Sequence, residues 1–211
     1  VNNPNAFYRK AIRPEVYEKA EPVSDPLNMF DTAPYADGAA AVLLARTSGL
    51  PEGYAHPRVR ISGSSAAVDT LALHDRPDPL AFEAAARSTQ AACRQAGILP
   101  ADVDLFELSD TYSIFAALSL EASGFARRGE GWKLAQDGSL ALGGKLPVMT
   151  MGGHKARGNP IGAAGVYQII EAALQLRGQA GANQVKNARR ALVQSLGGPA
   201  STAVTHVLER V

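Results

Sequence analysis

Glycine is concentrated, together with polar side chains, in one fourteen-residue stretch, residues 152–165, which reads GGHKARGNPIGAAG. Glycines let a backbone approach a ligand closely and take up positive φ angles, and Asn159 followed by Pro160 is typical of a helix N-cap and first turn. We therefore expect a loop that opens into a helix, whose free N–H groups face a negative charge or a carbonyl oxygen. A plain tight turn between a strand and a helix is the alternative, which the basic side chains inside the loop disfavour.

His154 is the one group in this loop whose pKa would suit a base near neutral pH. The alternative is that its ring caps or braces the loop. Tyr112 offers a phenol further back in the chain, or it is a helix residue packed against the sheet. The other histidines stand alone, with no Cys, Asp or Glu at metal-ligand spacing, so we expect no metal site.

The apolar pattern predicts the elements that hold this loop. Residues 148–151 read as a short strand that leads into it, and the helix after it shows apolar residues at helical spacing until Gly178. The chain then closes with the apolar runs 191–195 and 201–208, separated by Leu196–Pro199, which predict a hairpin.

Upstream, the pattern predicts a strand at 59–64, an alanine-rich helix at 80–96 that stops at Gly97, and a second strand at 103–108. Asp110 is expected to cap the helix that follows. Three further segments have less regular patterns. Irregular residues 1–36 are expected to be a connecting or lid segment, and residues 39–45 a buried strand or a helix that leads into one. Residues 127–147 are expected to form a surface excursion that contains Trp132. Strands and helices thus alternate, which indicates an α/β layer fold with a mixed sheet.

Composition narrows the class of protein. The 211 residues include 46% hydrophobic and 19% charged residues, with a formal net charge of +1, so nothing favours nucleic acid or an anionic membrane as a partner. No apolar run approaches the length of a membrane span. The single cysteine, Cys93, excludes an internal disulfide and fits a reducing cytoplasm.

Three blocks, in this order and spacing, resemble the thiolases, in the branch of the sterol-carrier-protein thiolases and acetyl-CoA acetyltransferases: residues 107–112, residues 152–165 and residues 195–198. The resemblance covers almost the whole chain and implies the C-terminal half of a five-layer α/β/α/β/α fold. Residues 1–50 are similar to the end of the loop region and the last element of the N-terminal half, and residues 57–211 to the C-terminal half. The N-terminal half, with the family's nucleophilic cysteine, would have to be supplied by the same protein or by another chain.

The resemblance implies chemistry on coenzyme A thioesters, with the thioester as substrate and no further cofactor. Such chemistry needs a nucleophile, a base for the proton next to the thioester, and oxyanion holes. Asn159 stands where the family usually has a histidine; its amide can donate to an oxyanion but cannot take a proton. Ser195 stands where the family has an acid/base cysteine, and a hydroxyl is too weak an acid for that role unless a base lies beside it.

The first block, residues 107–112, also differs from the family pattern. Ser109, Asp110 and Tyr112 lie where relatives carry Asn-Glu-Ala-Phe or His-Asp-X-Phe. We expect these three residues, with His154, Asn159 and Ser195, to form the catalytic site. The glycines expected to lie against substrate are Gly153, Gly158, Gly197 and Gly198. Lys155 and Arg157 either reach the phosphates of coenzyme A or are plain surface charges.

Two functions follow from the resemblance. One is a thiolase-like acyltransferase subunit that makes or breaks C–C bonds next to an acyl-CoA thioester, in lipid metabolism. The other is a catalytically inactive thiolase fold that binds acyl-CoA or serves as a scaffold. Both imply an N-terminal half as partner, a homodimer or higher oligomer, and a cytoplasmic location.

Overall fold

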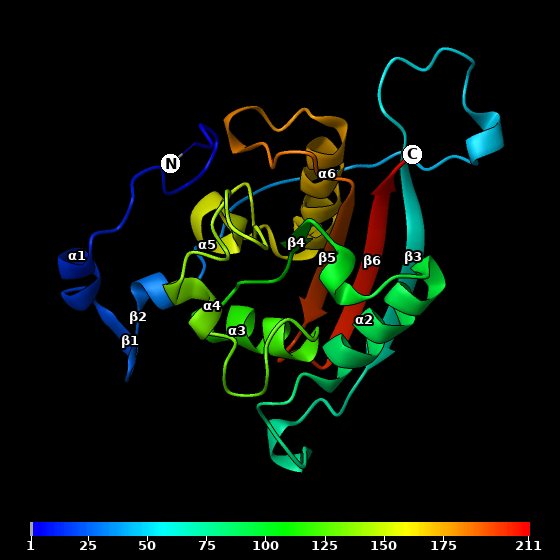
Figure 1. Ribbon diagram of the computed structural model, residues 1–211. Coiled ribbons are helices and arrows are strands. Elements are labelled where there is room, and N and C mark those ends of the chain that lie inside the picture. The colour runs from blue at the N-terminus through cyan, green and yellow to red at the C-terminus, as the bar shows by residue number, and fades with distance from the viewer. Residues whose placement is uncertain (1) are drawn as a thin grey trace.

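The computed structural model describes residues 2–211 as a mixed α/β fold around one four-stranded sheet (Figure 1). The strand order is β3-β6-β5-β4, with β4 parallel to β5 and the other pairs antiparallel. The strands of this sheet are β3 (Val59–Val68), β4 (Leu105–Glu107), β5 (Arg190–Gly197) and β6 (Thr202–Arg210). The predicted α/β class and mixed sheet are therefore confirmed.

Helices cover both faces of the sheet. Helices α2 (Glu83–Ala96) and α3 (Ser113–Ala122) pack on one face, and α6 (Ala164–Arg177) packs on the other (Figure 1). Alternation along β5 divides the core accordingly, because Leu192 faces α2 and α3 whereas Ala191 and Val193 face α6.

Small side chains bring α2 unusually close to the sheet. Its buried face consists of alanine, serine, threonine and cysteine, and Cys93 is 3% exposed, as expected for a structural thiol. At Gly63 in β3, any side chain would collide with the backbone carbonyl of Ala92. The sequence therefore lets a helix and a strand touch at backbone distance.

The helices end where their sequence signals indicate. Gly97 and Gly178 follow α2 and α6 in the left-handed conformation, with φ angles of 68° and 74°. The predicted hairpin between β5 and β6 is present, but its turn spans 198–201 rather than Leu196–Pro199, because Leu196 and Gly197 still pair with β6. Strand β3 extends four residues further than predicted, and β4 is shorter than the predicted 103–108.

Other predictions were wrong in detail. The run 39–45 forms neither strand nor helix, and Leu43 is fully exposed; no strand of residues 2–211 pairs with the run, so its backbone lacks ladder hydrogen bonds. Residues 148–151 do not form a named strand; Val148 makes one isolated bridge to Phe106. The surface excursion contains the one-turn helix α4 (Lys133–Gln136), beside the half-exposed Trp132.

The N-terminal segment runs past the glycine-rich loop (Figure 1). It contains the short elements α1 (Pro14–Glu18), β1 (Pro22–Ser24) and β2 (Leu27–Asn28) and is otherwise irregular, as predicted. Backbone hydrogen bonds join Phe7 and Tyr8 to the loop, with Phe7 N donating to the carbonyl of Arg157 and Tyr8 N to that of Ala156. The segment therefore braces one side of the loop.

Candidate functional site

The glycine-rich loop folds into a short helix followed by a bend. Helix α5 (Gly153–Arg157) occupies its first part, a 3-10 turn spans Ile161–Ala163, and α6 begins only at Ala164. The prediction that the long helix begins at Asn159 or Pro160 was thus early by about one turn. The reason is local: Ile161 has a φ of 48°, which a continuous right-handed helix does not allow.

Ile161 is a strained position next to the expected site. A positive φ is costly for a β-branched residue and is typical of places that the surrounding structure holds in a required geometry. Its backbone N–H donates to Oδ1 of Asn159 at 3.0 Å. The Asn159 side chain therefore forms an Asx-type turn that leads into the 3-10 turn, and it does not cap α6.

Asn159 is held from both sides along its backbone. Its N–H donates to the carbonyl of Pro34 at 2.9 Å, and its own carbonyl accepts from the N–H of Ala36 at 3.1 Å. The residue is 7% exposed, and its Nδ2 makes no hydrogen bond within residues 2–211. An oriented amide donor with a free N–H is what an oxyanion site requires.

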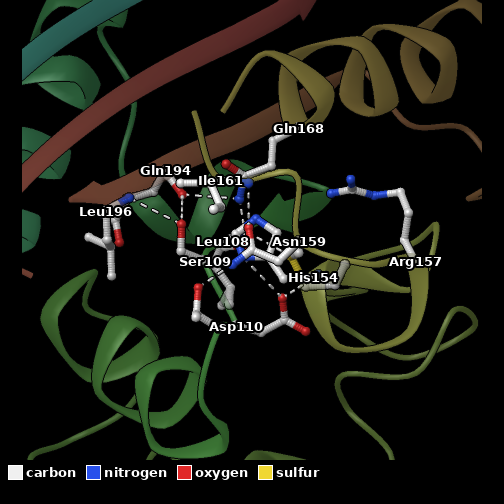
Figure 2. A network of polar contacts seen from close by, with 12 residues as sticks. Leu108, Ser109, Asp110, His154, Arg157, Asn159, Ile161, Gln168, Gln194 and Leu196 are labelled. Atoms are coloured by element: carbon white, nitrogen blue, oxygen red, sulfur yellow. Dashed lines mark hydrogen bonds and ion pairs between the residues drawn. The ribbon is translucent and has the colours of Figure 1, made fainter. Parts of the chain in front are cut away.

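Asp110 does not cap the helix that follows it. Helix α3 begins at Ser113 without a side-chain cap, whereas Oδ1 of Asp110 accepts the backbone N–H of His154 at 2.7 Å (Figure 2). Burial raises the pKa of Asp110 to about 6. The carboxylate therefore accepts a hydrogen bond from the first turn of α5, which lies about 40 residues further along the chain. Local sequence spacing could not predict this contact.

Gly153 explains why this contact is so close. It has a φ of 60°, and a Cβ at this position would overlap the Asp110 carboxylate. We expect Gly153→Ala to destabilise the protein by about 2 kcal/mol or more, from backbone strain and the displaced carboxylate together. Urea unfolding of the variant measures the loss.

Gly162→Ala is the matched control for that experiment, since Gly162 has an ordinary φ and nothing within 4 Å of its added Cβ. It should leave the free energy of unfolding within about 0.5 kcal/mol. Equal losses in the two variants would contradict the close approach at Gly153.

His154 is buried and neutral. It is 3% exposed, its Nδ1 lies 3.2 Å from Oγ1 of Thr111, and its Nε2 has no hydrogen-bond partner within residues 2–211. Burial, and then the positive charge of Arg157, lowers its pKa to about 4. A base with that pKa accepts protons poorly at neutral pH, so the geometry favours the bracing role over the catalytic one.

Ser109 joins the ends of two strands. Its Oγ donates to the carbonyl of Gln194 and accepts the N–H of Leu196, at 3.4 and 3.1 Å (Figure 2). Gln168 of α6 bonds to the same region, since its Nε2 donates to the carbonyls of Leu108 and Gln194. Sequence analysis missed Gln168, although a glutamine within an apolar helical stripe was a usable signal. These bonds fix the strand ends that precede Asp110 and Ser195.

Ser195 faces a pocket of about 490 Å³ between the β5–β6 hairpin and the start of α6. Gly197 and Gly198 line the same pocket, as does Ile161 from the glycine-rich loop. The predicted residues thus fall into two neighbouring groups: Ser195 with its two glycines, and Asp110 with Gly153 and His154. Asn159, between Gly158 and Ile161, connects them.

Tyr112 and the two remaining basic residues lie differently from expectation. Tyr112 precedes α3 rather than lying in it; it is 41% exposed and packs edge-on against Phe115. Lys155 donates to Oγ of Ser113, and Arg157 pairs with a carboxylate inside the fold. Neither cation is a plain surface charge, so that interpretation was wrong.

Arg157 belongs to a buried charge cluster that sequence analysis missed. Its Nε lies 2.7 Å from Oε1 of Glu171 on α6, and its guanidinium stacks over the ring of Tyr167 at 4.7 Å. Glu107 of β4 is completely buried nearby and accepts from the N–H and hydroxyl of Thr150. Figure 2 shows Arg157 set apart from the Asn159 group, reaching from the loop towards α6.

These elements match a known family model. Residues 65–210 match the family described as thiolase C-terminal domain-like. The chain belongs to the thiolase family. It is 38% identical over 209 residues to the acetyl-CoA acetyltransferase of Methanothermobacter thermautotrophicus, covering 99% of this chain and 54% of that protein.

Two further relatives match most of this chain. The human sterol carrier protein 2 is 30% identical, with 97% of this chain and 38% of that protein covered. The benzoylsuccinyl-CoA thiolase subunit BbsB of Thauera aromatica is 32% identical, with 88% and 48% covered. The chain thus spans about half the length, or less, of the curated relatives it matches.

A solved structure shares the architecture of this chain. The structure titled Ltp2-ChsH2(DUF35) aldolase superposes with a TM-score of 0.82 at 25% identity, covering 99% of this chain and 54% of that one. The resemblance stated from the sequence is therefore correct for the family and the fold.

The described residues add two negative findings. Within residues 2–211 no group of three or more His, Cys, Asp or Glu side chains is placed to hold a metal ion. In the same part of the chain, no helix has both the length and the apolar character that crossing a membrane requires.

Proposed function

We propose that this chain is the C-terminal half of a thiolase-like protein that makes or breaks a C–C bond next to an acyl-CoA thioester. Residues 57–211 would form this half, and residues 1–50 would belong to the loop region and the last element of the N-terminal half. The observation that carries the proposal is the oriented, unbonded amide of Asn159 beside the Ser195 pocket. An enolate or tetrahedral oxyanion would accept from that amide.

The relatives support this choice of chemistry. One is named an acetyl-CoA acetyltransferase and another a thiolase subunit, while the solved neighbour is named an aldolase. Claisen and retro-aldol reactions share an enolate, which needs an oxyanion donor. They differ in that the thiolase (Claisen) reaction also forms an acyl-enzyme, which needs a nucleophilic cysteine from the N-terminal half. The proposed substrate class is therefore acyl-CoA thioesters, with no cofactor of the protein's own.

The proposal extends to partners and location. The names of two relatives include a subunit or a second component, which supports a partner chain or domain here. We propose a homodimer or higher oligomer, in the cytoplasm, in lipid metabolism.

Asn159→Asp tests the oxyanion role. The aspartate keeps an oxygen for the N–H of Ile161 but removes the amide donor and adds a negative charge. We expect acyl-CoA turnover per folded molecule of the complete protein to fall by about 10²-fold or more, with the folded fraction measured on the same sample. Turnover at the unsubstituted level would refute the assignment of Asn159.

A catalytically inactive acyl-CoA-binding subunit is the second candidate. The observation that favours it is the loss of ordinary acid/base groups, since His154 has a pKa of about 4 and Ser195 lacks a thiol. Native mass spectrometry with acyl-CoA present separates the two functions. Bound acyl-CoA without turnover, in an assembly lacking a reactive cysteine, would support the inactive subunit.

A further inference from the structure

The Ser195 pocket contains one ionisable side chain, and it was not among the expected site residues. His206 of β6 lines the pocket together with Ser195, Gly165 and Val166. Sequence analysis set His206 aside because nothing with metal-ligand chemistry lies near it in the chain. Its position on β6 nevertheless places His206 near Ser195 in space.

The sheet register places Ser195 and His206 on the same face. Ser195 pairs with Val204, and Val193 pairs with His206, so both side chains project towards α6. They are diagonal neighbours on adjacent antiparallel strands, a relation in which backbone positions lie about 7–8 Å apart and long side chains can meet. The two side chains share the pocket but do not hydrogen-bond directly, so the imidazole would reach Oγ of Ser195 through one water.

Both groups have unused hydrogen-bonding capacity. Neither ring nitrogen of His206 makes a hydrogen bond within residues 2–211; Nδ1 is buried, so Nε2 is the nitrogen that can meet a water in the pocket. Oγ of Ser195 packs close to Gly165, where an added Cβ would lie 2.9 Å from it, and it makes no hydrogen bond in the described part of the chain. A hydroxyl and an unpaired ring nitrogen in one pocket are the parts of a proton relay.

The surroundings keep His206 neutral. The groups that face it are Val193 on β5, Ser64 on β3, and Val166 and Ile169 on α6, and none of them is charged. Burial lowers the pKa of His206 below its ordinary value, and no neighbouring charge contributes. The ring is therefore in its base form at neutral pH, and, unlike His154 beside Arg157, it has no cation next to it within residues 2–211 that opposes protonation.

We propose that His206 acts through Ser195 as the proton acceptor of the active site, in place of the family's acid/base thiol. This inference rests on the proposed acyl-CoA function. In the step, the Cα–H bond of the thioester breaks, its proton passes to Oγ of Ser195, and the hydroxyl proton of Ser195 passes to an imidazole nitrogen. The C–H electron pair becomes the enolate, whose oxygen accepts from Asn159, and imidazolium remains. The reverse sequence protonates the carbon.

The first test needs no turnover. The His206 ring is titrated by NMR in the complete protein and in its Ser195→Ala variant, with exposed His74 as the internal reference. We expect the pKa of His206 to shift by about 0.5 or more on loss of the hydroxyl, measured against the His74 signals in the same spectra. An unchanged His206 titration would overturn the proposal.

The second test measures deuterium exchange into the acyl group of acyl-CoA, which requires enolate formation but no nucleophilic cysteine. His206→Gln should slow exchange by about 10²-fold in the Ser195 protein. In Ser195→Cys, whose thiol can ionise by itself, the same substitution should slow it less than about 3-fold. Equal slowing in both backgrounds would mean a structural role and overturn the relay.

The two tests separate this inference from the function on which it rests. If no form of the protein, including Ser195→Cys, exchanges deuterium, the acyl-CoA function fails. The titration of His206 then still decides whether the ring and the Ser195 hydroxyl are coupled.

Discussion

Arg157→Met is expected to destabilise the protein by about 3–5 kcal/mol at pH 8, one of the two largest effects that the structure predicts. Arg157 is the positive partner of Glu171, with side chains 9% and 6% exposed, and Glu107 is buried close by. Removing the guanidinium leaves carboxylates in the protein interior without a compensating charge. Guanidinium chloride unfolding, with the linear extrapolation at fixed pH, measures the loss.

Two further variants show whether charge is the cause. Arg157→Met combined with Glu171→Leu removes both charges and should recover most of the loss. Arg87→Met removes an arginine whose Nε lies 3.8 Å from Glu83 with side chains 64% and 52% exposed, and it should cost less than about 1 kcal/mol. If the double variant is no more stable than Arg157→Met, the guanidinium acts through packing against Tyr167 instead.

Stability should also fall as pH rises, and Glu107→Gln should remove much of that dependence. Burial, and then the charge of Glu171, raises the pKa of Glu107 to about 8, and burial raises that of Glu171 to about 7 in spite of Arg157. Between pH 4.5 and 8 the folded state keeps a proton on Glu107 that the unfolded state releases. The unfolded state thus binds fewer protons, and the free energy of unfolding decreases with pH in this window.

The expected size of the Glu107 contribution is about 5 kcal/mol across that window, at about 1.4 kcal/mol per pH unit. Glu107→Gln carries no ionisable proton, so its stability relative to the unsubstituted protein should improve steadily from pH 4.5 to 8 and then level off. Urea unfolding at several pH values measures this difference. Parallel pH profiles for the two proteins would show that Glu107 is ionised in the folded state.

The sequence predicted those parts of the fold whose signals are local. Apolar periodicity located α2, α6 and the β5–β6 hairpin, and Gly97 and Gly178 marked helix ends because each is the residue that adopts the left-handed conformation there. The run 39–45 failed because a strand is defined by its neighbours, and none of residues 2–211 pairs with it.

The sequence identified the segments that form the candidate site, but it did not predict how their side chains are arranged. The three family blocks pointed to Asn159, Ser195 and Asp110, and the structure brings the surrounding loops together. The partners of these residues could not be predicted, because Asp110 binds a backbone N–H 44 residues away and Ser109 bonds across 85 and 87 residues. His206 escaped notice because its relation to Ser195 depends on strand register.

The order of strands in the sheet has a consequence for how the chain folds. In the described sheet β3 pairs only with β6. Residues 59–68 therefore cannot pair until residues 202–210, more than 130 positions later, are in place. Pairings this distant raise the contact order and slow the search for the native state. During synthesis, β3 emerges long before its partner exists, and its backbone edge stays open to wrong partners until the last strand arrives. Truncation within β6 would remove the partner of β3 in the described sheet and leave β5 paired with β4 alone.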